Sequence, residues 1–180
     1  MAVDTAPGSR RNFLVAAGSA LAATALPVED SRAQSPVPSV GLAPVAASDH
    51  WTIKRVGADN VKLYLRRKQL QGTDPGPARR GTILFVHGSS VSATPVFDLQ
   101  IPGKPEASTM DWFARAGFDT WCVDCEGYGY SDKSRPVNAD VACGADDLAA
   151  ASEYILRQTG AARLLIYGAS SGALRAGLFA

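Results

Sequence analysis

The stretch LLIYGASSGALRAG, residues 164–177, decides how this chain folds. A run of apolar and aromatic residues ends at Gly168, and a run with helix-forming residues begins at Gly172. This pattern predicts a strand, a sharp turn and a helix, with Ser170 at the turn. Such a turn crowds the backbone two residues before and two residues after its centre, so both positions require the smallest residue. The stretch therefore predicts a hydroxyl that is lifted clear of a sheet.

Three buried strands are predicted, and two helical segments separate them along the chain. TILFVHG, FDTWCVD and ARLLIYG are nearly continuous apolar runs, which is typical of parallel strands covered on both faces. A helix over MDWFARAG, capped by Ser108 or Thr109, separates the first two. A second helix, over about 138–159 with Gly160 as its end, precedes the third.

An antiparallel pair of strands precedes these elements. HWTIKRV and VKLYLRRK alternate in polarity, and GADN between them supplies a turn, so that together they predict a β-hairpin. The whole order predicts a three-layer α/β fold, in which a mostly parallel sheet carries an antiparallel hairpin at its start.

Length and charge limit the classes of partner. A chain of 180 residues with 46% apolar residues suits one globular domain. The net charge of +1, with acidic and basic residues interspersed, gives no electrostatic basis for binding nucleic acid. We therefore expect no nucleic-acid partner, and the oligomeric state stays open.

The N-terminal segment has the pattern of an export signal. Arg10 and Arg11 precede an alanine-rich apolar run over 13–26. This run is shorter than the roughly 20 residues that cross a bilayer, but it matches the apolar core of a signal peptide. The segment resembles a twin-arginine export signal, with cleavage after Ala33 in SRAQ. An alanine-rich amphipathic helix, a disordered tail and an uncleaved anchor are the alternatives.

This resemblance implies a domain organisation and a location. Residues 1–33 would be the signal peptide, 34–49 a flexible linker rich in Pro, Ser and Ala, and 50–180 the folded domain. The partner that the signal implies is the twin-arginine export machinery of a bacterium. The protein would then reach the periplasm or be secreted.

The three cysteines favour packing over chemistry. Cys122 and Cys125 have the spacing of a redox or metal motif, but the chain has no second such pair and no suitably spaced histidine. They also lie at the end of a predicted strand, where small buried side chains are typical. We expect no metal and no organic cofactor. A disulfide between Cys125 and Cys143 stays open.

Two further motifs follow the other buried strands. In VHGSS, residues 86–90, a strand that ends in His-Gly can place the backbone N–H of Ser89 beside the turn at Ser170. DCEGYGYSD follows the next strand and has the pattern D-x-x-G-x-G-x-S, beginning at Asp124. It is not a dinucleotide-binding fingerprint, because a third glycine is missing and no helix begins at once. We interpret it as a shaped loop at the carboxyl edge of the sheet.

These three motifs, in this order, resemble the α/β-hydrolase fold family, and within it the lysophospholipase-like and serine-aminopeptidase-like serine hydrolases. The resemblance covers residues 50–180, the N-terminal half of such a domain. It implies that Ser170 is the catalytic nucleophile and that Ser89 and Ser171 donate backbone N–H groups to an oxyanion. It also implies structural roles for His87, Gly88, Gly168, Gly172 and Asp124.

In this family the acid and the histidine of the catalytic triad follow later strands, so we expect the sequence to be a fragment that ends after the turn at Ser170. Two residues could substitute for them. His87 is an alternative base, although the family places it in the oxyanion loop, and Asp124 is an alternative acid, although a carboxylate that caps its own loop is favoured. His50 is expected to be an inert surface residue.

Without a base, a serine hydroxyl is a poor nucleophile at neutral pH. We therefore expect the 180-residue chain by itself to be inactive and poorly soluble. The leading hypothesis that the resemblance implies is hydrolysis of a small-molecule carboxylic ester, less readily an amide, through an acyl-enzyme on Ser170. The alternatives are hydrolysis of a C–C bond or perhydrolysis on the same fold, and a non-catalytic binding protein that keeps the scaffold.

Overall fold

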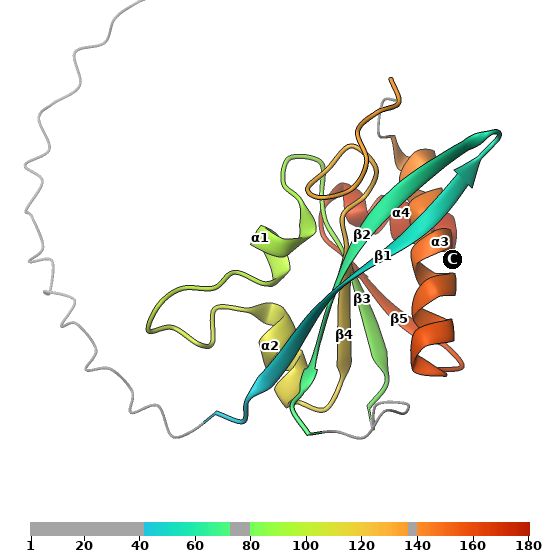
Figure 1. Cartoon of the computed structure of the whole chain (residues 1–180). Helices are drawn as coiled ribbons and strands as arrows, with labels where there is room; N and C mark the ends of the chain where they lie inside the picture. The colour runs from blue at the N-terminus through green and yellow to red at the C-terminus, as the bar shows by residue number, and fades with distance from the viewer. Residues whose placement is uncertain (1–41, 73–79, 137–139) are drawn as a thin grey trace, which may run out of the picture. The chain divides into compact units, whose positions relative to one another are not determined.

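Figure 1 shows the computed structural model of the chain, which describes residues 42–72, 80–136 and 140–180. The predicted export signal and residues 34–41 of the predicted linker lie outside the described residues. The elements, in chain order, are β1 (Val45–Val56), β2 (Asp59–Leu70), β3 (Thr82–Val86), α1 (Ala93–Phe97), α2 (Thr109–Arg115), β4 (Asp119–Val123), α3 (Val141–Thr159), β5 (Leu164–Gly168) and α4 (Ser171–Phe179). No helix within the described ranges has the length and apolar character needed to cross a membrane.

The strands form one mixed sheet in the order β1-β2-β4-β3-β5. β1 and β2 are an antiparallel hairpin, β2 is antiparallel to β4, and β4, β3 and β5 are parallel to one another. This confirms the predicted α/β fold with its N-terminal hairpin. Val86 at the end of β3 is in register with both Val123 of β4 and Gly168 of β5, so the loops after these three strands leave the same edge of the sheet.

The hairpin begins earlier than the sequence predicts. The sequence pattern predicts that residues 45–49 belong to the linker, but they lie in β1, where Val45 is opposite Leu70 and Asp49 is opposite Arg66. Main-chain hydrogen bonds do not depend on side-chain type, so the long β2 strand pairs with this weakly patterned segment. Asp49 Oδ1 also accepts a hydrogen bond of 2.8 Å from Arg66.

His50 consequently differs from the surface position that we expected. It lies inside β1, half-buried, with its ring 4.8 Å from that of Trp121 and Nδ1 3.0 Å from the Tyr154 hydroxyl. Burial lowers the pKa of His50. The residue therefore joins β1 to β4 and α3.

Helices cover both faces of the sheet, with α3 and α4 on one face and α1 and α2 on the other (Figure 1). Two hydrophobic cores result, the first beneath α3 and α4 and the second beneath α1 and α2. Because side chains alternate along a strand, Leu84 and Val86 of β3 lie in the first core and Phe85 lies in the second. The first core also contains Trp121, Val123, Leu148, Ala151 and Ile155, and the second contains Ala93, Phe97, Met110 and Cys122. The three predicted layers are therefore present.

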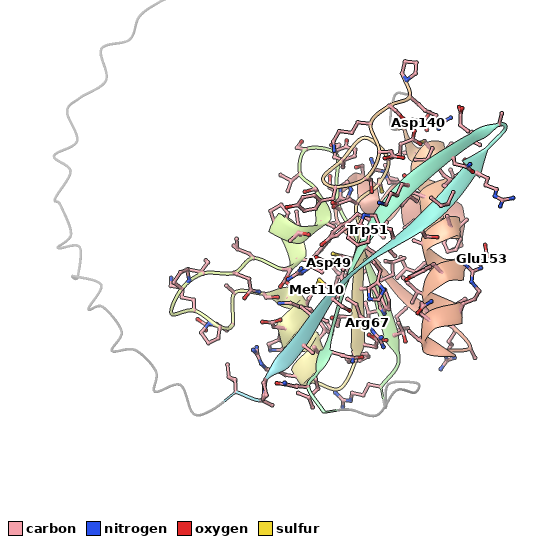
Figure 2. All side chains as sticks on the ribbon, in the orientation of Figure 1. Asp49, Trp51, Arg67, Met110, Asp140 and Glu153 are labelled. Carbon is pink, nitrogen blue, oxygen red and sulfur yellow. The ribbon has the colours of Figure 1, made fainter. Side chains whose placement is uncertain are left out.

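The two helices that the sequence predicts between the buried strands begin at polar caps. The side chain of Ser108 accepts a hydrogen bond from the backbone N–H of Asp111 at the start of α2, and Asp140 does the same for Cys143 at the start of α3. Gly160, with φ of 66°, ends α3. Figure 2 shows Glu153 on the outward side of this helix.

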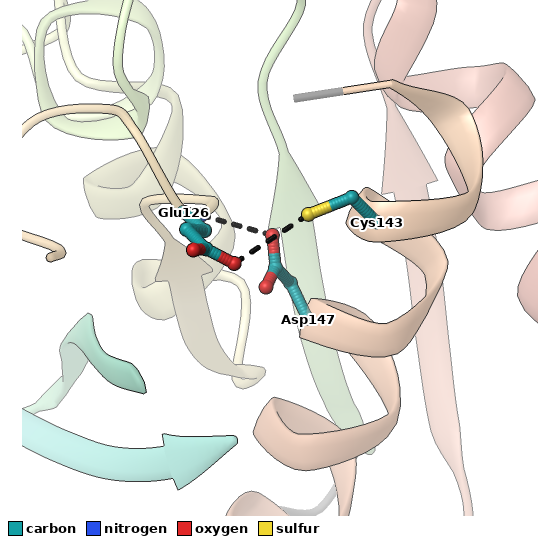
Figure 3. A group of neighbouring side chains, drawn as sticks. All are labelled: Glu126, Cys143 and Asp147. Carbon is teal, nitrogen blue, oxygen red and sulfur yellow. Dashed lines mark hydrogen bonds between the residues drawn. The ribbon is translucent and has the colours of Figure 1, made fainter. Parts of the chain in front are cut away.

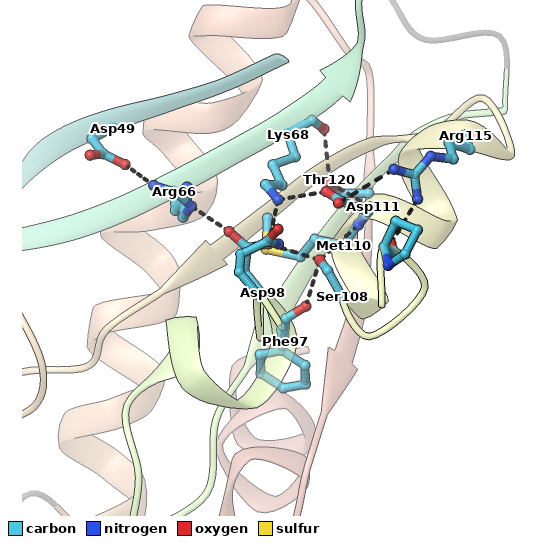
Figure 4. A network of polar contacts seen from close by, with 12 residues as sticks. Asp49, Arg66, Lys68, Phe97, Asp98, Ser108, Met110, Asp111, Arg115 and Thr120 are labelled. Atoms are coloured by element: carbon cyan, nitrogen blue, oxygen red, sulfur yellow. Dashed lines mark hydrogen bonds and ion pairs between the residues drawn. The ribbon is translucent and has the colours of Figure 1, made fainter. Parts of the chain in front are cut away.

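α1 was not predicted, because five residues are too few to show a helical period. A buried ion network fixes it to the hairpin (Figure 4). The Lys68 ammonium lies between Asp98, at the end of α1, and Asp111 of α2. Burial alone would raise the pKa of Asp98, but hydrogen bonds from Lys68, Ser108 and Arg66 outweigh burial and lower it.

β5 is an edge strand of the described sheet, and apolar side chains beside it are exposed. Leu165 and Tyr167 of β5 are 48% and 56% exposed, and Leu174 and Leu178 of α4 are 63% and 59% exposed. An unpaired edge flanked by exposed apolar side chains favours association between chains.

We therefore predict that the 180-residue polypeptide associates through this face. Replacing both Leu174 and Leu178 with Gln should reduce its aggregation, because the change removes apolar contact area without disturbing the core. Light scattering and size-exclusion chromatography at pH 7 would measure this. Trp112→Gln is the control, since Trp112 is 60% exposed on α2. Equal improvement in the control would contradict the assignment to the α4 face.

Candidate active site

Ser170 lies at a strained turn between β5 and α4. Its backbone has φ of 53° and ψ of −125°, and within the described ranges it is the one residue other than glycine with a positive φ. This conformation is unfavourable for a residue with a Cβ atom and is typical of functional sites. The side chain is exposed and does not cap the helix that it precedes. The predicted strand, turn and helix are confirmed, and the hydroxyl is exposed.

The two glycines around Ser170 are required by their surroundings. A Cβ atom on Gly168 would lie 2.4 Å from the Gly172 carbonyl oxygen, and one on Gly172 would lie 2.3 Å from the Val86 carbonyl oxygen. Both distances are far below van der Waals contact, and both partners are main-chain atoms. The steric crowding expected from the sequence is therefore present, and it brings the start of α4 against the end of β3.

The loop after β3 reaches Ser170. A Cβ atom on Gly88 would lie 3.1 Å from Ser170 Cβ and 3.6 Å from Ser170 Oγ. The backbone N–H of Ala169 donates a hydrogen bond of 3.0 Å to the Val86 carbonyl oxygen, which fixes the two loops to each other. The structure thus places VHGSS beside the serine.

Sheet topology explains why these two loops meet. The chain passes from β3 to β4 through α1 and α2 on one face, and from β4 to β5 through α3 on the other. β3 and β5 are neighbours in the sheet, but the chain leaves β3 toward the face covered by α1 and leaves β5 toward the face covered by α4. In open α/β sheets, ligands bind at this point, outside the carboxyl ends of the strands.

The two predicted oxyanion donors border the same position. Ser171 is the first residue of α4, where backbone N–H groups have no acceptor within the helix and the helix dipole is positive. Ser89 is exposed in the loop after β3, next to Gly88. Their role as donors stays a prediction, and their placement suits it.

His87 is a buried structural residue. Its Nε2 accepts a hydrogen bond of 3.0 Å from the backbone N–H of Cys125, so the ring carries its proton on Nδ1 and donates it to the Gly88 carbonyl oxygen at 2.6 Å. Burial lowers the pKa of His87, which favours this neutral form. Because the Nε2 lone pair is already used, the geometry disfavours His87 as the base for Ser170.

Asp124 holds two loops together. One carboxylate oxygen accepts from the backbone N–H of Ala93 at 2.7 Å, and the other accepts from that of Tyr130 at 2.9 Å. Gly129 has φ of 48°, and a Cβ atom there would lie 1.8 Å from the Asp124 carboxylate. The geometry therefore favours the loop-capping role over that of a triad acid.

Two residues that contact the site were not singled out from the sequence. Tyr128 donates its hydroxyl proton to the Ser89 carbonyl oxygen at 2.7 Å. Arg175 of α4 is buried and donates to the His87 carbonyl oxygen at 3.2 Å. The D-x-x-G-x-G-x-S spacing marked the loop of Tyr128, but nothing in the sequence marks Arg175, because a single arginine in a short helix is usually solvent-exposed.

Buried Glu126 and Asp147 form a cluster with the half-buried Cys143, and the ligand atoms of the three residues lie within 4.8 Å of one another (Figure 3). This spacing could hold a metal ion, but Lys54 already supplies a positive charge there. The Lys54 ammonium lies 2.7 Å from Glu126, 2.5 Å from Asp147 and 3.4 Å from Cys143 Sγ. We therefore interpret the cluster as an ion network that ties β1 to α3.

The ionisation of this cluster follows from its contacts. Hydrogen bonds from Arg135, and then from Lys54, lower the pKa of Glu126 to about 2, whereas burial raises the pKa of Asp147. Burial alone would lower the pKa of Lys54, but hydrogen bonds to Asp147 and Glu126 outweigh it and raise the pKa.

All three cysteines are free thiols, so the open Cys125–Cys143 disulfide is not formed. Cys122 and Cys125 are buried, as the packing interpretation predicts, and burial raises the pKa of Cys125 to about 12.

The fold and the exposed serine at the divergence of β3 and β5 define an α/β hydrolase scaffold. More particularly, the chain belongs to the serine aminopeptidase S33 family, whose profile matches residues 77–180, more than half of the chain. No match was found among curated proteins.

Solved structures of hydrolases share the fold. A protein described as a predicted CIB-like hydrolase from Thermoplasma acidophilum has a TM-score of 0.51 and 19% identity over 76% of this chain and 56% of its own. An esterase from Pyrococcus furiosus has a TM-score of 0.52 and 21% identity over 73% of this chain and 44% of its own. A probable hydrolytic enzyme from Pseudomonas aeruginosa PAO1 has a TM-score of 0.50 and 23% identity over 73% of this chain and 36% of its own. The chain thus spans about half or less of each of these structures.

Because Gly172 contacts the Val86 carbonyl oxygen, we predict that adding a side chain at Gly172 destabilises the fold. Gly172→Ala should lower the free energy of unfolding by about 1–3 kcal/mol, as overpacking does, because the methyl group meets a main-chain oxygen. Gly177→Ala is the matched control in the same helix, where a Cβ atom meets nothing within 4 Å. That control should be neutral or gain up to about 1 kcal/mol from helix propensity. Urea unfolding of the full-length protein measures both, and equal effects would refute the steric argument.

The Lys54 cluster makes a second prediction. Lys54→Met keeps most of the length of the side chain but leaves two buried carboxylates without their shared cation, which typically costs about 3–5 kcal/mol. We expect a loss of this size in urea unfolding at pH 7. Arg55→Met is the control, because Arg55 is exposed on the other side of the same strand. A stable Lys54→Met variant would mean that the cluster does not stabilise the fold.

Proposed function

We propose that this protein is a serine hydrolase that cleaves a carboxylic ester through an acyl-enzyme on Ser170. The observation that carries the proposal is the backbone of Ser170, held at a positive φ of 53° with its side chain exposed. A residue with a Cβ atom keeps such a strained conformation only where the surrounding structure enforces it, and residues of this kind cluster at active sites. Ser170 also lies next to the two candidate main-chain donors, Ser89 and Ser171, which supports its role as a nucleophile.

In the proposed mechanism Ser170 Oγ attacks the carbonyl carbon of the substrate. The carbonyl oxygen becomes an oxyanion, which the backbone N–H groups of Ser89 and Ser171 stabilise. The proton taken from Ser170 passes to the leaving alcohol, and water then hydrolyses the acyl-enzyme to release the acid and restore the Ser170 hydroxyl. The helix dipole of α4 favours the negative charge at the same place.

The base that accepts the Ser170 proton is assigned to neither histidine of this chain. The Nε2 atom of His87 accepts from Cys125, and His50 contacts Ser48 and Tyr154 from within β1. The family resemblance places both the base and its acid after later strands, and we adopt that assignment for the full-length protein.

The choice of an ester over an amide is supported by the shared fold with an esterase. The name of the family refers instead to an aminopeptidase. Both chemistries use an acyl-enzyme on the same serine, so one variant tests them together. Parallel assays with p-nitrophenyl acetate and an amino-acid p-nitroanilide separate the two substrate classes.

We predict that Ser170→Ala abolishes hydrolysis of the preferred substrate and labelling by a fluorophosphonate probe in the full-length protein. The reason is that the probe reacts with an activated serine hydroxyl and with little else. Ser90→Ala, which changes an exposed serine in the neighbouring loop, should label as the wild type does. A wild-type protein that does not label would favour a non-catalytic binding protein.

A further inference from the structure

We propose that Tyr128 is a positioning residue of the oxyanion site, which holds the Ser89 segment so that the Ser89 N–H faces the reacting carbonyl. The inference rests on the proposed function. It assigns a role to the DCEGYGYSD loop, which otherwise takes no part in the mechanism.

The Ser89 donor belongs to a peptide plane that His87 fixes. The N–H of Ser89 and the carbonyl of Gly88 are parts of the same planar trans peptide, so they point in opposite directions. The Gly88 carbonyl oxygen accepts from Nδ1 of the buried His87 at 2.6 Å. The Ser89 N–H is therefore directed away from the His87 ring.

The next peptide plane is fixed by Tyr128. Its hydroxyl donates to the Ser89 carbonyl oxygen at 2.7 Å, so the peptides on both sides of Ser89 Cα each have a side-chain anchor. Ser89 and Ser90 are exposed, and packing alone does not hold them. The hydrogen bond from Tyr128 therefore restricts rotation at the residue that carries the donor.

The two anchors are parts of one unit. The ring centroids of Tyr128 and His87 are 4.6 Å apart, and the Tyr128 N–H donates to the carbonyl of Cys125, whose own N–H fixes the His87 tautomer. The Arg175 guanidinium, from the helix that follows Ser170, lies 5.6 Å from the centre of the Tyr128 ring. Tyr128 thus contacts both segments that border Ser170, the loop after β3 through His87 and α4 through Arg175.

A purely structural role for the hydroxyl is separable from this one. The hydrogen bond lies at the surface, so water can replace it when the hydroxyl is removed. Tyr128→Phe keeps the ring and its contacts with His87 and Arg175. The variant should therefore unfold as the wild type does, while the Ser89 segment becomes free to rotate.

The test is Tyr128→Phe in the full-length protein, assayed with a p-nitrophenyl ester. Loss of a whole oxyanion donor costs about 100- to 1,000-fold in kcat, so a donor that is present but less well held should cost about tenfold. KM should change little, because the oxyanion interaction forms in the transition state. Binding of a trifluoromethyl ketone, which mimics the oxyanion, should weaken by the same factor as kcat.

Tyr154→Phe is the matched control. It removes another tyrosine hydroxyl with a side-chain hydrogen bond, 3.0 Å to His50 Nδ1, outside the two loops of the site. Its kcat and inhibitor affinity should equal those of the wild type. Wild-type kcat and inhibitor affinity in Tyr128→Phe, or equal losses in both variants, would overturn the positioning role.

The outcomes separate the two proposals. If Ser170→Ala is inactive and Tyr128→Phe behaves as the wild type, only the role of Tyr128 is lost. If the wild-type protein neither hydrolyses the tested ester and amide substrates nor reacts with a fluorophosphonate, both proposals are overturned.

Discussion

The rest of the site depends on the close approach of the first turn of α4 to the end of β3. Gly172 lies against the carbonyl oxygens of Val86 and His87, at distances that leave no room for a side chain. Ser170 joins β5 to α4 beside this contact, with φ of 53° and an exposed side chain. The strained residue is therefore held next to a close contact between main-chain atoms.

The second constraint is a set of hydrogen bonds through which the loop after β4 fixes the loop after β3. Cys125 fixes His87, Tyr128 fixes Ser89, and Asp124 fixes Ala93 at the start of α1. All three contacts are hydrogen bonds to or from the backbone. They set the path of the β3 loop at its start, its middle and its end. A donor placed in this way needs little reorganisation when charge develops near it.

Buried charges join the layers away from the site. Lys54 links β1 to α3, and Lys68 links β2 to α1 and α2, each between two carboxylates. A buried ammonium between carboxylates favours one arrangement of its elements, because any other leaves a charge without a partner. The hairpin contributes Val61, Leu63 and Leu65 to the core, and these two lysines help to position it on the sheet.

The sequence by itself determined most of the helices and strands and the turn at Ser170. Apolar runs marked β3, β4 and β5, glycines marked the turn and the end of α3, and both signals are local, so they need no knowledge of the fold. Local signals were too weak for α1 and for residues 45–49, where pairing with β2 decides the structure.

Only the tertiary structure decided how the predicted site residues are used. The tautomer of His87 depends on Cys125, and the path of Ser89 depends on Tyr128, which lies 39 residues further along the chain. Lys54 meets Cys143 across 89 residues, and nothing in the periodicity of either segment records the contact. Such contacts follow from strand order and register, which bring distant segments together. A pattern confined to one segment contains no information about them.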